Sequence, residues 1–330
     1  MTDNAVACRH VTIDPDTGSL SIAQGLVQQP AAGEVLINVQ CAGINRADLL
    51  QRKGLYPPPE DASPILGLEV AGTVKAVGPD VGDWQVGDAI CALTHGGGYA
   101  DYALAPVGQC MPVPNGFSMQ EAAALPEALL TIWHNLYQRA GLKSGDNVLV
   151  HGGASGMGTM GVMMAHALGA TVYTTAGTAE KCSALQVLGA TRAINYREED
   201  FEKVLGELGV AGSINVILDM IGGDYVQKNL NVAAPEGRIV NIAYMRGFKA
   251  EVNFAPLLMK RLTLTGSTLR AQTFAQKAVM VEELLEHVFP HLENGNIRPL
   301  VDSTFTLENA QDAHTRMESG EHMGKIILTL

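Results

Sequence analysis

The residues with the clearest chemical meaning are three glycines spaced as Gly156-x-Gly158-x-x-Gly161. An apolar stretch, Val148–Val150, precedes them, and an alanine- and methionine-rich stretch follows up to Gly169. In a strand–turn–helix unit, the first glycine makes a tight turn, the second lets the backbone approach a diphosphate and the third allows close helix packing. The helix amides and the helix dipole then face the phosphates. The pattern predicts a dinucleotide site formed by Ser155, Gly156, Met157 and Gly158, and the alternative is a glycine-rich turn without a ligand.

A second polar group follows the next expected strand. Sites specific for NAD place an Asp or Glu about 20 residues past the first glycine, where it holds the ribose hydroxyls. Here Gly177 and Thr178 occupy the end of that strand, and neither is a carboxylate. Lys181, one helical turn later, can offer positive charge to a 2′-phosphate, and Tyr196 can donate from the neighbouring strand end. These residues favour NADP(H), and the alternative is a solvated Lys181 whose charge Glu180 cancels.

Alternating strands and helices would position these residues, and the sequence shows such an alternation after about residue 121. A helix-forming segment from Gln120 to Arg139 leads into it. The expected strands are Asn147–Val150, Thr171–Thr175, Arg192–Asn195, Ile214–Asp219, Gly237–Ala243 and Leu262–Thr265, and the expected helices include Ala179–Leu188, Glu198–Leu208 and Tyr225–Ala233. This alternation predicts an α/β fold with a doubly wound, six-stranded parallel sheet, a Rossmann domain.

The rest of the chain has a different pattern. Residues 1–120 contain short apolar strands separated by glycine and proline turns, as in Glu34–Val39. After Gly266, two expected helices, Thr273–Leu285 and Leu307–Glu318, precede an apolar closing strand at Gly324–Thr329. We expect that strand to return to the N-terminal sheet. The expected domains are therefore a discontinuous β-rich outer domain, residues 1–124 and 266–330, and an inserted nucleotide-binding domain, residues 125–265.

The amino-acid composition narrows the range of binding partners and of cellular locations that we expect. The 330 residues are 47% hydrophobic and 17% charged, which is typical of a compact globular protein. The net charge of −12 argues against general affinity for nucleic acid or anionic membranes. Five scattered cysteines without a Cys-x-x-Cys pair favour reduced thiols and a cytoplasmic location. Neither a signal peptide nor a run of 18 apolar residues is evident, so we expect no membrane association.

Several further segments carry a resemblance to a known family. They are Ala42–Gly54, Leu66–Gly72, Gly98–Tyr102, the glycine motif, Ile194–Tyr196, Gly266–Arg270 and Gly324–Leu328. In this order they resemble the zinc-free quinone oxidoreductases of the medium-chain dehydrogenase/reductase superfamily, and most closely the zeta-crystallin-like, p53-inducible-type branch. The resemblance implies a GroES-like outer domain beside the Rossmann domain. It also implies NADPH:quinone reductase activity, with hydride transfer from NADPH to a quinone in the cleft between the domains.

The resemblance also bears on metal binding. Zinc-dependent members of the superfamily have a cysteine where Asn45 stands and a histidine where Leu68 stands. Neither side chain can replace a thiolate and an imidazole on zinc. The cysteine-rich structural zinc lobe is missing as well, because Cys91 is followed within eight residues by Tyr99. We therefore expect a zinc-independent enzyme without a metal.

Two residues are candidate catalytic and substrate-binding groups by this resemblance. Asn45 lies on a loop that the family directs toward the substrate, and Tyr56 stands where the family places a tyrosine over the nicotinamide. Both can donate to the oxyanion that develops on the acceptor. The alternatives are a turn cap for Asn45 and packing against Pro57–Pro59 for Tyr56.

The resemblance further implies cofactor contacts from Tyr56, Thr131, Ala243, Tyr244, Leu269, Arg270 and Lys325. Tyr244 and Arg270 would also border the substrate. The alternatives are a helix-face hydroxyl for Thr131, a loop brace for Arg270 and an edge-strand charge for Lys325.

Two other functions remain open. An NADPH-dependent enone or enoyl-thioester reductase would share the fold and would need a proton donor to the α-carbon, for which Tyr56 could serve. A non-catalytic NADPH-binding protein, crystallin-like or RNA-binding, belongs to another class, and the acidic charge weakens its RNA-binding form. The small-molecule partner is thus a quinone or an activated carbonyl. The open, apolar edge strand Leu262–Thr265 predicts a homodimer, with a tetramer as the alternative.

Overall fold

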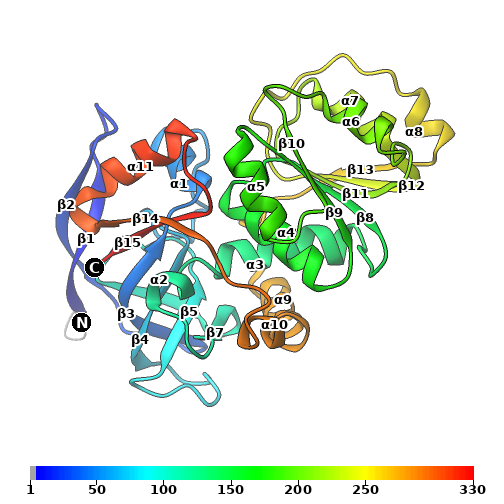
Figure 1. Ribbon diagram of the computed structural model, residues 1–330. Coiled ribbons are helices and arrows are strands. Elements are labelled where there is room, and N and C mark those ends of the chain that lie inside the picture. The colour runs from blue at the N-terminus through cyan, green and yellow to red at the C-terminus, as the bar shows by residue number, and fades with distance from the viewer. Residues whose placement is uncertain (1–4) are drawn as a thin grey trace. The chain divides into compact units, whose positions relative to one another are not determined.

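Figure 1 shows a computed structural model that describes residues 5–330. The chain divides into two compact units, each with its own sheet. Unit 1 comprises residues 1–130, 272–293 and 299–330, and unit 2 comprises residues 131–271 and 294–298. The first strands and the last strand therefore belong to the same unit, as their blue and red ribbons show.

Unit 2 contains a six-stranded sheet in the order β10-β9-β8-β11-β12-β13, and every pair in it is parallel. The strands are β8 (Asn147–Val150), β9 (Thr171–Ala176), β10 (Arg192–Asn195), β11 (Ile214–Asp219), β12 (Ala233–Asn241) and β13 (Thr263–Gly266). This confirms the predicted Rossmann sheet. The prediction succeeds because strands buried on both faces appear in the sequence as short, nearly continuous apolar runs.

The helices of unit 2 alternate with these strands. They are α4 (Gly156–Ala167), α5 (Ala179–Val187), α6 (Phe201–Glu207), α7 (Tyr225–Val232) and α8 (Ala255–Met259). Phe201 of α6 and Tyr225 of α7 pack with Leu149 and Ile217 of the sheet in one hydrophobic cluster. Because all strands of the sheet are parallel, their carboxyl ends meet at one edge, where open α/β sheets bind their ligands.

The segment before the sheet differs from the prediction. The expected single helix over Gln120–Arg139 is divided into α2 (Met119–Ala122), α3 (Pro126–Ile132) and a π-helix, η2 (Trp133–Arg139). Pro126 begins α3, because proline lacks an N–H and fits only the first turn of a helix. The prediction of one continuous helix was wrong at this proline.

Unit 1 is built on a seven-stranded sheet and a separate hairpin. The sheet runs β14-β15-β3-β4-β5-β7, with β6 also pairing with β3, and β1 pairs with β2. The strands are β1 (Val6–Ile13), β2 (Leu20–Val27), β3 (Glu34–Gly43), β4 (Glu69–Val77), β5 (Ala89–Leu93), β6 (Tyr102–Pro106), β7 (Cys110–Pro112), β14 (Val301–Thr306) and β15 (Lys325–Thr329). Ile327 of β15 lies opposite Gly43, so the closing strand returns to the N-terminal sheet as expected.

Unit 1 also contains helices, and β14 forms one edge of its sheet beside β15. The helices of unit 1 are α1 (Arg46–Arg52), η1 (Val107–Gln109), α2, α9 (Phe274–His287), α10 (Phe289–Glu293), η3 (Leu307–Asn309) and α11 (Ala310–Ser319). The sequence did not predict β14, because polar residues fill most of its positions and leave only a weak alternation. Across residues 5–330, no helix is both long and apolar enough to cross a membrane. All five cysteines are buried and unpaired.

Candidate functional site

The three glycines of the motif lie in the first two turns of α4, and Ser155 fixes the turn at residues 151–155 that joins β8 to this helix. Ser155 is the N-cap of α4, and its hydroxyl accepts from the Gly158 N–H at 2.9 Å and donates to the Gly152 carbonyl at 2.8 Å. A Cβ on Gly158 would overlap the Gly152 carbonyl and lie 2.6 Å from Gly153 Cα. Gly158 is therefore required for the start of α4 to pack against the turn that precedes it. This requirement holds whether or not a phosphate also approaches the glycine.

The first turn of α4 has the features of an anion site. The Thr159 N–H donates to the Ser155 carbonyl, so the amides of Gly156 and Met157 precede the hydrogen-bond ladder of the helix. Gly161 keeps α4 close to its neighbours, because a Cβ there would lie 3.2 Å from Ile132 Cδ1. Free amides, a helix dipole and a glycine-lined turn fit a dinucleotide diphosphate. Its contacts with Ser155, Gly156, Met157 and Gly158 stay predictions.

The ends of β9 and β10 bring Gly177 and Tyr196 together. A Cβ on Gly177 would lie 2.7 Å from the Tyr196 hydroxyl oxygen and 3.5 Å from Arg197 Nε. The absence of a side chain at position 177 thus leaves room for the tyrosine to lie over the strand end. Arg197 was not predicted, although its place directly after Tyr196 was a usable signal. Its exposed guanidinium adds positive charge beside these residues.

Thr178 and Lys181 open the helix that follows β9. Thr178 is the N-cap of α5, and its hydroxyl accepts from the Lys181 backbone N–H at 3.2 Å. Backbone hydrogen bonding, together with the Thr178 hydroxyl, lowers the pKa of Glu180. Glu180 is therefore anionic at neutral pH and fully exposed to solvent, which screens its effect on a phosphate beside Lys181.

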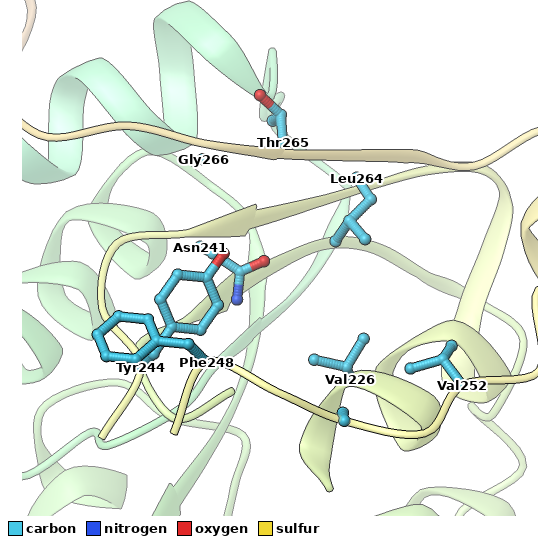
Figure 2. Close-up of a pocket in the computed structure, with 9 residues that line it drawn as sticks. Val226, Asn241, Tyr244, Phe248, Val252, Leu264, Thr265 and Gly266 are labelled. Atoms are coloured by element: carbon cyan, nitrogen blue, oxygen red, sulfur yellow. The ribbon is translucent and has the colours of Figure 1, made fainter. Parts of the chain in front are cut away.

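The end of β12 opens into a cavity of about 400 Å³ in unit 2 (Figure 2). Tyr244 and Phe248 form one wall of the cavity, with ring centroids 5.4 Å apart. Their exposed fractions are 41% and 86%. Asn241 also lines it, but its side-chain amide donates to Asp219 at 3.0 Å. Polar and apolar groups therefore share the lining of the cavity, and Tyr244 is placed to limit its size.

The remaining predicted residues of unit 2 lie on three segments, at the end of α3, after β12 and after β13. Thr131 is buried near the end of α3, and its carbonyl accepts from Asn135 Nδ2 at 2.8 Å. Asn135 Oδ1 in turn accepts from the Ser267 hydroxyl at 2.8 Å, which joins η2 to the segment after β13. Leu269 in that segment is buried and Arg270 is partly buried. Ala243 precedes Tyr244 just after β12. Cofactor contacts from these residues stay predictions.

In unit 1, Asn45 and Lys325 meet at Glu69, although 280 residues separate the first two in the sequence. Lys325 is 3% exposed, and its ammonium forms an ion pair with Glu69 and donates to Asn45 Oδ1 at 2.7 Å. Asn45 Nδ2 donates to Glu69 Oε1 at 2.8 Å and lies 3.5 Å from the Gly43 carbonyl. Lys325 is thus bound within unit 1, and one Asn45 N–H has only a weak partner.

A second buried carboxyl, Asp48, adjoins this group. Its Oδ2 accepts from the Asn45 backbone N–H at 2.8 Å and from the Tyr99 hydroxyl at 3.1 Å. Burial raises the pKa of Asp48 to about 6, against the lowering effect of these hydrogen bonds. The Tyr99 hydroxyl also lies 3.3 Å from Nε2 of His314, whose pKa burial lowers to about 4. His314 is therefore neutral at physiological pH.

The sequence analysis missed Glu127, at the start of α3. Its backbone N–H donates to Glu69 Oε2 at 2.9 Å, which places it beside the Asn45–Glu69–Lys325 group. Burial, followed by the negative charge of Glu69, raises the pKa of Glu127 to about 7. A glutamate after Leu-Pro in an apolar helix was the available signal. Tyr56, by contrast, is partly buried in the loop after α1, and its donor role stays a prediction.

Comparison with known proteins places this architecture in a family. Residues 31–115 match a family described as alcohol dehydrogenase GroES-like domain, and residues 188–328 match one described as zinc-binding dehydrogenase. Quinone oxidoreductase from Lama guanicoe is 32% identical over 307 residues, which cover 91% of this chain and 90% of that protein. The chain belongs to the medium-chain dehydrogenase/reductase superfamily. Within residues 5–330, no group of three or more His, Cys, Asp or Glu side chains is arranged to hold a metal ion.

Other members of the superfamily carry different names. A 2-haloacrylate reductase from Burkholderia is 30% identical, with 92% of both chains covered. The crystal structure of Escherichia coli quinone oxidoreductase complexed with NADPH superposes with a TM-score of 0.85 and 29% identity, covering 98% of this chain and 100% of that one. A polyketide synthase subunit from Mycobacterium tuberculosis is 31% identical over 308 residues, but this chain spans only 14% of its length. The chain is thus a member of this superfamily, and its relatives are named for different acceptors.

Proposed function

We propose that this protein is an NADPH-dependent quinone oxidoreductase that works without a metal. The observation that carries the proposal is the group at the ends of β9 and β10. Tyr196 lies over Gly177, Thr178 caps the helix that bears Lys181, and no carboxylate occupies the strand end. This arrangement suits a 2′-phosphate, which a carboxylate would repel. The quinone oxidoreductase from E. coli, named as an NADPH complex, supports the same cofactor.

In the proposed reaction NADPH supplies the hydride, and the protein positions the acceptor and stabilises charge. A quinone accepts hydride readily because its reduction gains aromaticity. The weakly bonded Asn45 N–H and the Tyr56 hydroxyl are the proposed donors to the developing oxyanion. The Lys325–Glu69 pair holds Asn45 in one orientation, so it acts as a positioning element. Thr131 and the backbone of Ala243, Leu269 and Arg270 are proposed to border the nicotinamide.

The second candidate is an enone or enoate reductase. The 2-haloacrylate reductase, which matches over most of its length, favours this reaction class. A conjugated carbonyl spreads the charge left by hydride addition, so it requires the same oxyanion donors. The conjugated carbonyl differs from a quinone because its reduction also requires a proton at the α-carbon.

The experiment that tests the proposal is an acceptor panel with NADPH as reductant. Oxidation of NADPH would be followed by its absorbance with an ortho-quinone, a para-quinone, a simple enone, a 2-haloacrylate and an enoyl thioester. We expect turnover with both quinones to exceed turnover with the other acceptors. Preferential reduction of an enone, haloacrylate or thioester would assign the second candidate. Tight NADPH binding without turnover of any acceptor would contradict both.

A further inference from the structure

The carboxyl group of Glu127 has no role in the reaction as described so far. Its backbone is fixed by Glu69, but none of the hydrogen bonds or ion pairs of residues 5–330 involves its side-chain oxygens. The residue is also partly exposed, unlike Glu69 and Asp48, which are fully buried. A carboxyl group without a protein partner, on the exposed side of a buried polar cluster, is available to a ligand.

The charges around Glu127 favour its neutral form. Glu69 of β4 and Asp48 of α1 oppose its ionisation, and Lys325 of β15 and Lys277 of α9 favour it. Lys325 is already paired with Glu69, and its remaining donors reach Asn45 and the Ile44 carbonyl. Of the three carboxyls, only Glu69 is bound directly to an ammonium. Glu127, whose side chain makes no hydrogen bond, is the carboxyl best able to keep a proton. Burial and Glu69 raise its pKa to about 7.

The same cluster contains the proposed oxyanion donor. Asn45 Nδ2 lies 2.8 Å from Glu69 Oε1, and the Glu127 N–H lies 2.9 Å from Glu69 Oε2. The Glu69 carboxylate thus accepts a hydrogen bond from each of these residues, on different oxygens. An acceptor bound against the Asn45 amide would therefore lie beside the polar cluster to which Glu127 belongs.

We propose that Glu127 is the proton donor of the reduction, a role that rests on the proposed reductase function. Hydride addition gives the quinone two electrons and one hydrogen, and leaves a phenolate oxygen. The O–H bond of Glu127 breaks, a new O–H bond forms on that oxygen, and hydroquinone results. NADPH becomes NADP⁺, and the Glu127 carboxylate regains a proton from water through its exposed side. With an enone, the same proton would reach the α-carbon or the enolate oxygen.

The proposal is tested with Glu127→Gln, which preserves the shape of the neutral acid but cannot give up a proton. General acid catalysis contributes roughly 10²–10⁴-fold to a rate. We expect kcat of Glu127→Gln to fall by about 100-fold or more, with KM for the acceptor and NADPH affinity little changed. In the wild type, kcat should decrease as pH rises through about 7, since only the protonated acid donates. Glu127→Gln should lack this decrease.

A matched control and a readout independent of turnover complete the test. Glu286→Gln alters an exposed carboxyl on α9 and should keep the wild-type rate and pH profile. Infrared titration of the wild type should show a protonated carboxyl band that disappears near pH 7 and is missing in Glu127→Gln. Wild-type kcat and pH dependence in a folded Glu127→Gln, or an unchanged infrared band, would overturn the proposal. If the wild-type enzyme itself reduced no acceptor, the proposed function would fail instead.

Discussion

At the scale of single residues, the buried ion pair between Lys325 and Glu69 determines what the surrounding side chains can do. Lys325 was expected to contact the cofactor or to charge a strand edge. In the structure its ammonium is bound by Glu69, Asn45 and the Ile44 carbonyl within unit 1, and the cofactor contact stays a prediction. A cofactor contact by Lys325 would require some of these bonds to break. The sequence could not reveal the pairing, because Glu69 and Lys325 lie 256 residues apart.

Lys325→Met tests the structural importance of this pair. Removing the ammonium leaves Glu69 buried without its counter-charge, which typically costs about 3–5 kcal/mol. We expect the free energy of unfolding, measured by denaturant titration, to fall by that order. The double variant Lys325→Met with Glu69→Gln should recover part of the loss, because no uncompensated charge remains. Unchanged stability of Lys325→Met would show that the pair is not a structural element.

At the scale of elements, the strand–turn–helix unit from β8 to α4 was predictable because its pattern is local. Apolar strands, glycine turns and N-cap residues lie within a few positions of one another, so β8, β10 and β11 begin and end where expected. The polar strand β14 was missed, because its formation depends on pairing with β15 that no local pattern records. The division of Gln120–Arg139 at Pro126 was also missed, although the proline is itself a local signal.

Gly158→Ala tests the close approach of α4 to its turn. The added methyl group would meet the Gly152 carbonyl and Gly153 Cα, which are backbone atoms that cannot rotate away. We expect a lower melting temperature and at least tenfold weaker NADPH binding, measured by thermal unfolding and fluorescence titration. Gly206→Ala on α6 is the matched control, since nothing lies within 4 Å of the added Cβ. Helix propensity alone should stabilise it by up to about 1 kcal/mol. Equal behaviour of the two variants would refute the packing argument.

At the scale of the whole molecule, the edge of the Rossmann sheet is the clearest candidate for self-association. β13 forms one edge of the six-stranded sheet, and Leu264 on it is 39% exposed. Large apolar side chains nearby are also exposed: Tyr244, Met245, Phe248, Phe254, Leu258 and Met259. Exposed edge strands with apolar side chains are prone to pair with another chain. We therefore propose a homodimer formed through this edge.

Leu264→Lys tests the dimer. A charge on the edge strand should oppose its pairing with a second copy. We expect light scattering after size exclusion to give a dimer mass for the wild type and a monomer mass for Leu264→Lys. Val187→Lys, at an exposed position on α5, should remain dimeric. A wild-type monomer across the micromolar range, or a dimeric Leu264→Lys, would rule out this interface.

The most direct measurement of the central claim is calorimetric titration of the wild type and Lys181→Ala with NADPH and NADH. If Lys181 contacts the 2′-phosphate, the wild type should bind NADPH more tightly than NADH. A hydrogen bond to a charged group contributes roughly 1.5–3 kcal/mol, so Lys181→Ala should lose about tenfold or more in NADPH affinity. Its NADH affinity should be unchanged, and Lys203→Ala on α6 should behave as wild type. An unaltered NADPH preference in Lys181→Ala, or no heat with either nucleotide, would contradict the account.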